Sequence, residues 1–90
     1  MKNKNLRSEQ DIESWLVERV AEIVLLVAHE IDPNAPHADL GLDSASAVLL
    51  IADLEDELGI ELSPALAWDH ATLRSIAKHI AGLLAQKGAA

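Results

Sequence analysis

Residues 43–59 read DSASAVLLIADLEDELG, and this stretch decides the fold of the chain. Its apolar residues recur at steps of three and four, which predicts a helix from about Ser44 to Leu58. Asp43 or Ser44 is the expected N-cap, and Gly59 lies just past the end, where glycine commonly ends a helix. One face of this helix should point inward, and it consists of Ala47, Leu50, Ile51, Leu54 and Leu58.

A second long helix is expected before this stretch. Ser8, followed three residues later by Asp11, forms a variant of the capping box. The apolar residues that follow share one helical face: Ile12, Leu16, Val20, Ile23, Val27 and Ile31. Residues 24–26 widen that face, so we expect this helix to be covered on more than one side. It should end near Ile31, because Pro33 disfavours the helical conformation in the residue before it.

The segments after Gly59 predict one short helix and one long helix. A helical turn is expected at residues 65–68, and the last helix should begin near Thr72, a good cap residue. Its inward face would consist of Leu73, Ile76, Ala77, Ile80 and Leu84. The loop over residues 32–43 is longer than the roughly two to eight residues that usually join helices in small bundles. We therefore predict an all-α four-helix bundle with three main helices and one short helix.

The composition predicts a single small domain with an aliphatic core. The chain has 90 residues, half of them apolar, but its only aromatic residues are Trp15 and Trp68. It contains no cysteine, which excludes disulfides, thiolate metal sites and cysteine nucleophiles. We expect residues 9–85 to form the domain, between a disordered lead-in of residues 1–8 and a frayed tail of residues 86–90.

The charge of the chain disfavours some classes of binding partner. The net charge is −8, and between Val20 and Leu73 there are eleven Asp and Glu residues but no Lys or Arg. Nucleic-acid phosphates and anionic membrane surfaces would repel such a chain, whereas a basic protein surface would attract it. No apolar run is longer than that of residues 23–28, which is far shorter than the roughly 20 residues of a membrane span. The N-terminus lacks the apolar stretch of a secretory signal, so we expect a cytoplasmic protein. We also expect it to be a monomer.

Ser44 is the candidate for chemistry, because it stands at the first turn of the predicted helix. Gly41 permits a tight turn just before it. Unpaired backbone N–H groups and the helix dipole give this end roughly half a positive charge. A phosphodiester on the Ser44 hydroxyl would be stabilised there by about 0.3–1 kcal/mol. On helix physics alone, however, a plain N-cap is the simpler interpretation of Ser44.

Residues 41–44, GLDS, resemble the (L)GxDS motif of acyl carrier proteins, in which the serine carries a 4′-phosphopantetheine arm donated by coenzyme A. The resemblance extends over residues 12–84. Val48 and Leu50 match the apolar positions after the serine, and residues 54–59 resemble the acidic end of the second helix. Residues 66–72 are similar to the short third helix and the start of the fourth. The family therefore implies the same bundle that the periodicity predicts.

Residues 15–22 and 66–70 are similar to carriers associated with fatty-acyl-AMP ligases and polyketide synthases. Asp43 stands where peptidyl carriers usually have a second glycine. The chain departs from the family pattern at two positions. Ala45 replaces a bulky apolar residue, which bears on partner recognition, and Ala71 replaces a proline at the start of the last helix.

The resemblance implies a carrier rather than an enzyme, with no catalytic residues. Ser44, beside the motif residue Asp43, would hold the arm, whose thiol carries a fatty-acyl or polyketide intermediate as a thioester between enzymes. The implied partners are a phosphopantetheinyl transferase, an acyl-AMP ligase or acyltransferase, and a downstream ketosynthase, oxidoreductase, desaturase or thioesterase. Two alternatives remain open: a peptidyl carrier in nonribosomal peptide synthesis, and an unmodified interaction module with a carrier fold.

We define a docking stripe on the second predicted helix as Ala45, Leu49, Ala52, Asp53 and Asp56. These residues avoid the inward face, and they are small or apolar near Ser44 and acidic further along. Such a surface would steer a basic partner, because complementary charge raises the association rate. In the alternative interpretation, Leu49 is partly buried against the long loop and residues 53–57 are simply a solvated face.

Other candidate sites are weaker. No short metal-ligand spacing relates the four histidines, so we expect no metal site; they are His29, His37, His70 and His79. A Ser-His-Asp hydrolase built on Ser44 and His70 would lack both a sheet and a G-x-S-x-G elbow. We expect His37 to pack partly over the helix ends, Trp68 to fill core space at the short helix, and Trp15 to be half exposed.

Overall fold

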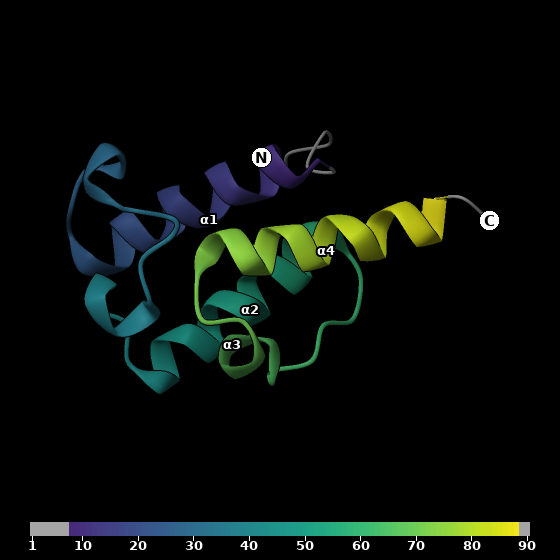
Figure 1. Cartoon of the computed structure of the whole chain (residues 1–90). Helices are drawn as coiled ribbons and strands as arrows, with labels where there is room; N and C mark the ends of the chain where they lie inside the picture. The colour runs from purple at the N-terminus through teal and green to yellow at the C-terminus, as the bar shows by residue number, and fades with distance from the viewer. Residues whose placement is uncertain (1–7, 89–90) are drawn as a thin grey trace.

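The computed structural model describes residues 8–88, whose regular elements are all helical (Figure 1). In chain order these are α1 (Glu9–Val24), the 3₁₀ turns η1 (Ala28–Glu30) and η2 (His37–Leu40), α2 (Ser44–Leu58), the one-turn α3 (Leu66–Asp69) and α4 (Leu73–Gly88). This order confirms the predicted all-α bundle of three main helices and one short helix. Within the same residues, no helix is both long enough and apolar enough to cross a bilayer.

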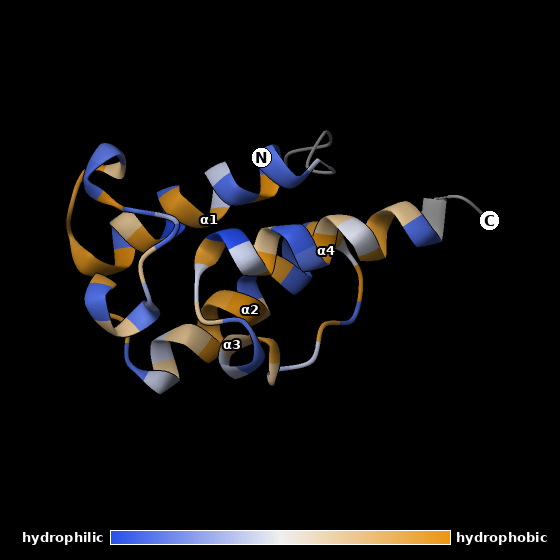
Figure 2. Ribbon diagram, in the orientation of Figure 1, coloured by the Kyte–Doolittle hydropathy of each residue, from blue (hydrophilic) through white to orange (hydrophobic). Residues whose placement is uncertain are grey.

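Aliphatic side chains from the three long helices meet in one core. α1 packs mainly along α4, and the apolar faces of the helices turn toward each other (Figures 1 and 2). The large side chains with almost no exposed surface are Ile12, Leu16, Val20, Leu50, Ile51, Leu54, Leu73, Ile76 and Ile80. Burying each stabilises the fold by about 1.5–3 kcal/mol, so no aromatic residue is needed at the centre. Leu58 and Leu84, also predicted to face inward, are half-buried at the edge.

The predicted end of the first helix near Ile31 is wrong, because α1 ends at Val24. Leu25 adopts a left-handed conformation with φ 62°, and the backbone N–H groups of Leu25 and Leu26 both bond to the carbonyl of Ala21. The chain therefore leaves the helix axis, and Ile31 reaches the core from beyond η1 with 5 % of its surface exposed. The expected cover over residues 24–26 is only partly present: Val24 is half-buried against the core, whereas Leu25 is 88 % and Leu26 49 % exposed.

Main-chain hydrogen bonds fasten the long loop to the start of α4. His37 donates its backbone N–H to the carbonyl of Ala71 over 3.1 Å, and Arg74 donates to that of Pro33 over 3.0 Å. Thr72 caps α4 by accepting the N–H of Ser75, as its position predicts. The loop and the α3–α4 connection thus form one layer at the end of the bundle where α2 begins (Figure 1).

Two further expectations differ from the structure. Trp68 does not fill the core, because Leu66 and Ala67 occupy the inward side of the single turn of α3 and leave the indole 63 % exposed. Residues 86–88 continue α4 rather than forming a tail. The predicted lead-in, apart from the cap residue Ser8, and the last two residues of the predicted tail lie outside the described residues. Trp15 is half-buried, as expected.

Candidate functional site

The turn before α2 presents Ser44. Gly41 has φ 86°, a left-handed conformation that glycine adopts without strain, and it ends η2. Leu42 then inserts into the core and donates its N–H to the carbonyl of His37. This buried anchor forces the next residues to the surface, so that Asp43 and Ser44 are both exposed.

Asp43, and not Ser44, is the N-cap of α2. Its carboxylate accepts the backbone N–H of Ser46 over 2.7 Å, and this hydrogen bond lowers the pKa of the Asp43 carboxyl below its ordinary value. Ser44 is the first helical residue, and capping makes no demand on its hydroxyl. The interpretation of Ser44 as a plain N-cap is therefore wrong.

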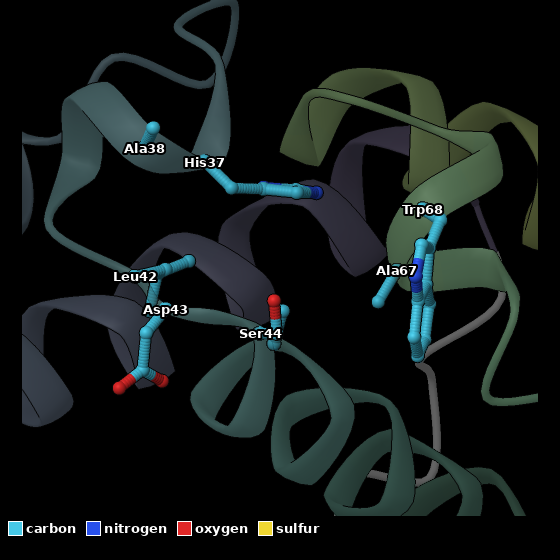
Figure 3. A pocket seen from close by; sticks show the side chains of 8 residues that line it. His37, Ala38, Leu42, Asp43, Ser44, Ala67 and Trp68 are labelled. Atoms are coloured by element: carbon cyan, nitrogen blue, oxygen red, sulfur yellow. The ribbon is translucent and has the colours of Figure 1, made fainter.

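The Ser44 hydroxyl opens onto a pocket of about 220 Å³ between η2, the start of α2 and α3. Figure 3 shows the hydroxyl of Ser44 pointing toward the ring of His37, which reaches across the pocket, with Trp68 on the far side. The side chain of Asp43 points away from this space (Figure 3). The site thus combines an exposed nucleophilic oxygen, the positive end of a fifteen-residue helix and an adjacent hollow with an apolar wall.

His37 ties this site to the α3–α4 connection, in agreement with its predicted partial packing. Its ring nitrogen Nε2 lies 2.9 Å from the backbone oxygen of His70. The ring of His70 in turn contacts Ser75 through Nδ1 at 2.8 Å and stacks on that of His79 at a centroid distance of 4.7 Å. Sequence spacing did not indicate these histidine contacts, because their members come from η2, the α3–α4 connection and α4. Within residues 8–88, no group of three or more His, Asp or Glu side chains is placed to hold a metal ion.

The docking stripe lies on the surface of α2. Its exposed members are Ala45, Leu49, Ala52 and Asp56. The alternative in which Leu49 packs against the long loop is wrong, because 63 % of Leu49 is exposed. Asp53 is half-buried, and its carboxylate lies 4.0 Å from the guanidinium of Arg19 on α1. The acidic end of the stripe is therefore partly compensated by a basic residue that sequence reasoning did not connect with it.

The arrangement fits a phosphopantetheine group. The Ser44 hydroxyl, which would be esterified, belongs to an exposed residue and does not cap α2. The N-terminus of α2 favours the negative phosphodiester. The hollow beside it can receive part of a flexible chain.

Comparison with known proteins identifies the family. Residues 14–80 match the family described as "Phosphopantetheine attachment site". The chain is 32% identical over 77 residues to a phenolphthiocerol/phthiocerol polyketide synthase of Mycobacterium tuberculosis, and 34% identical over 83 residues to a 6-methylsalicylic acid synthase of Penicillium patulum. These matches cover 86% and 88% of the chain but only 4% and 5% of the two synthases.

Solved structures agree with this assignment. An acyl carrier protein from Anabaena sp. PCC 7120 with a variant phosphopantetheinylation-site sequence superposes with a TM-score of 0.80 at 30% identity, covering 93% of this chain and 92% of that one. A free-standing peptidyl carrier protein from Acinetobacter baumannii gives 0.81 at 29% identity, covering 87% and 98%. With its matched site family, its helical order and an exposed serine at the start of α2, the chain belongs to the phosphopantetheine-binding carrier proteins, whose cofactor is a covalently attached 4′-phosphopantetheine.

Proposed function

We propose that Ser44 carries the 4′-phosphopantetheine arm and that the chain is an acyl carrier for fatty-acyl or polyketide intermediates. The observation that carries this proposal is the exposed Ser44 hydroxyl, which capping leaves unused and which opens onto a pocket. The polyketide synthases among the relatives support the acyl assignment, and so does Asp43 in the place where peptidyl carriers usually have glycine.

The chemistry at Ser44 is a phosphoryl transfer from coenzyme A. The Ser44 oxygen forms a bond to the phosphorus next to pantetheine, its proton leaves with a base of the transferase, and the bisphosphorylated adenosine half departs. The N-terminus of α2 stabilises the new phosphodiester by about 0.3–1 kcal/mol. When attached, the arm supplies a thiol that holds acyl groups as thioesters, which suits a chain without cysteine.

Mass spectrometry tests the attachment. The protein is incubated with coenzyme A and a promiscuous phosphopantetheinyl transferase, in parallel with Ser44→Ala and Ser46→Ala. Ser46 is the matched control because its hydroxyl lies on the same helical turn. We expect the mass of one arm to be added to the wild type and to Ser46→Ala, and no addition to Ser44→Ala. An unmodified wild type would instead favour an interaction module with a carrier fold.

The acyl assignment has its own test. The arm-bearing protein is offered to fatty-acyl-AMP ligases and to amino-acid adenylating enzymes, and the loaded mass is measured. Loading with fatty-acyl groups supports the proposal. Loading with amino acids alone would make the chain a peptidyl carrier.

We also propose that the docking stripe contacts the enzymes that act on the arm. Leu49 is an exposed apolar side chain on the face of α2 that does not pack against the core, and Asp56 lies on the same exposed face. Leu49→Glu and Asp56→Lys should slow arm attachment and acyl loading without changing the circular dichroism spectrum. Ala85→Glu on α4 adds the same negative charge as Leu49→Glu, but at an exposed site outside the stripe, and it should have no effect. Unaltered kinetics in both stripe variants would remove the proposal.

A further inference from the structure

The pocket beside Ser44 is lined by a side chain that holds a hydrogen-bond acceptor without a donor. His37 Nε2 lies 2.9 Å from the backbone oxygen of His70, which can only accept, so the neutral ring carries its proton on Nε2. Nδ1 then bears a lone pair, and it is buried with no hydrogen-bond partner within the described residues. A buried acceptor that lacks a donor is unfavourable, so a donor that reached Nδ1 would remove this cost.

The opposite wall of the same pocket is an indole that the fold leaves uncovered. Trp68 is 63 % exposed, although it follows the buried residues Leu66 and Ala67 on a single helical turn. Figure 3 shows His37 and Trp68 on either side of the space that the Ser44 hydroxyl faces. A large apolar ring and the ring of His37, whose Nδ1 is shielded from solvent, therefore flank the point from which an attached chain would start.

The size of the pocket limits what it can receive. Its volume of about 220 Å³ is below the roughly 300–1,000 Å³ of sites that enclose a drug-sized molecule. It can therefore take a short segment of chain but not a long acyl group. A segment that fits must be covalently close to Ser44, must present a hydrogen-bond donor and must have an apolar portion.

We propose that the pocket is a resting site for the first part of the phosphopantetheine arm, in which a hydroxyl or amide N–H of the arm donates to His37 Nδ1 while its dimethyl-substituted carbon packs on Trp68. This inference rests on the proposed attachment at Ser44. Because Nδ1 is shielded in the arm-free chain, the His37 ring must tilt about its bond to His70 to meet the donor. His37 acts as a positioning residue, which holds the arm along α3 until an enzyme draws it out.

Two spectroscopic readouts test the proposal on intact protein before and after arm attachment. In Trp15→Phe, Trp68 is the sole indole, and attachment should reduce its quenching by acrylamide. In the wild type labelled with ¹⁵N, attachment should shift the His37 Nδ1 resonance in the direction of an accepted hydrogen bond while the proton stays on Nε2. An arm-bearing protein in which either readout keeps its arm-free value overturns the proposal. Absence of the mass gain at Ser44 would instead reject the proposed function, so the two failures are distinguishable.

Matched variants separate positioning from folding. His37→Gln can still donate to the His70 carbonyl from the position of Nε2, but it places no acceptor at the position of Nδ1. We expect it to keep the wild-type circular dichroism and to lose the arm-dependent shielding of Trp68. Trp68→Phe leaves Trp15 as the reporter on α1, outside the pocket, and its quenching should not respond to the arm. Full shielding in His37→Gln overturns the role of His37; if that variant does not fold, the wild-type resonance decides.

Discussion

Glu55 on α2 accepts a hydrogen bond of 2.9 Å from the backbone N–H of Leu62, seven residues further along the chain. This contact fastens the segment between α2 and α3 to the last turns of α2. The acidic run of residues 55–57 is therefore not a uniform solvated surface, because at least one of its carboxylates holds the backbone in place.

Replacing Glu55 should affect stability rather than docking. Glu55→Ala leaves the part-buried Leu62 N–H without its acceptor and should lower the free energy of unfolding by about 1 kcal/mol. Glu55→Gln retains an amide oxygen that can accept, so it should lose less. Urea unfolding measures both, and Glu61→Ala at an exposed neighbouring site is the control. Equal losses in the Ala and Gln variants would contradict the assigned role of the hydrogen bond.

Asp43 should give the fold a specific dependence on acid pH. The pKa of its carboxyl is lowered in the folded state, chiefly by the N–H of Ser46. Its stabilising contribution is therefore complete above the unfolded-state pKa of about 3.9 and is lost as the pH falls through the lowered folded-state pKa. Asp43→Asn keeps a capping oxygen but cannot titrate in this range. We expect thermal melts to show that this variant loses less stability than the wild type below about pH 4. Parallel curves of melting temperature against pH for the two proteins would disprove the linkage.

Arg19 should moderate the negative field of the docking stripe. Its guanidinium lies 4.0 Å from Asp53 and 3.6 Å from Glu22, and 5.1 Å from the centre of the Trp15 ring. Arg19→Gln should cost less than about 1 kcal/mol of stability, because these pairs are at the surface. It should also accelerate loading by a basic partner at low salt, and the gain should vanish at high salt.

Arg74→Gln is the matched control for Arg19→Gln. It removes the same unit of charge, but Arg74 pairs with Glu13 over 3.0 Å between α4 and α1 rather than with the docking stripe. If both variants accelerate loading equally, net charge rather than the field at Asp53 governs docking.

Leu25 offers a stabilising substitution. A leucine in the left-handed conformation costs about 1 kcal/mol relative to glycine, and at 88 % exposure its side chain contributes little burial in return. Leu25→Gly should therefore raise the free energy of unfolding by about 1 kcal/mol. Leu25→Ala removes most of the same side chain but keeps the penalty, so it should not stabilise. Thermal melts compare the two, and equal behaviour would show that the conformation is not the cause.

The elements with strong local signals could be predicted from the sequence. The bounds of α2 agree because Asp43 and Gly59 mark both ends chemically. The end of α1 carries no such signal, because the left-handed residue there is Leu25 rather than a glycine and the apolar periodicity continues past it. The exposure of Trp68 also could not be predicted, since it depends on which side of α3 meets the core.

In the candidate site, too, the features with local sequence signals could be predicted and the long-range contacts could not. Ser44 follows from a contiguous run of residues and from the helix that begins there, and its role as the attachment point stays a prediction to be tested. The contacts between His37 and His70, and between Arg19 and Asp53, join residues more than thirty positions apart. Only the three-dimensional path of the chain brings such partners together.

The bonds that hold the long loop against the start of α4 run from N–H to carbonyl, at His37 to Ala71 and at Arg74 to Pro33. Such bonds do not depend on which side chains the loop bears, provided that proline does not replace a donor. The loop can thus exchange its outward-facing residues during evolution while keeping its course. A carrier that must satisfy several enzymes in turn gains from this latitude, since new recognition surfaces can arise beside the attachment serine without rebuilding the scaffold.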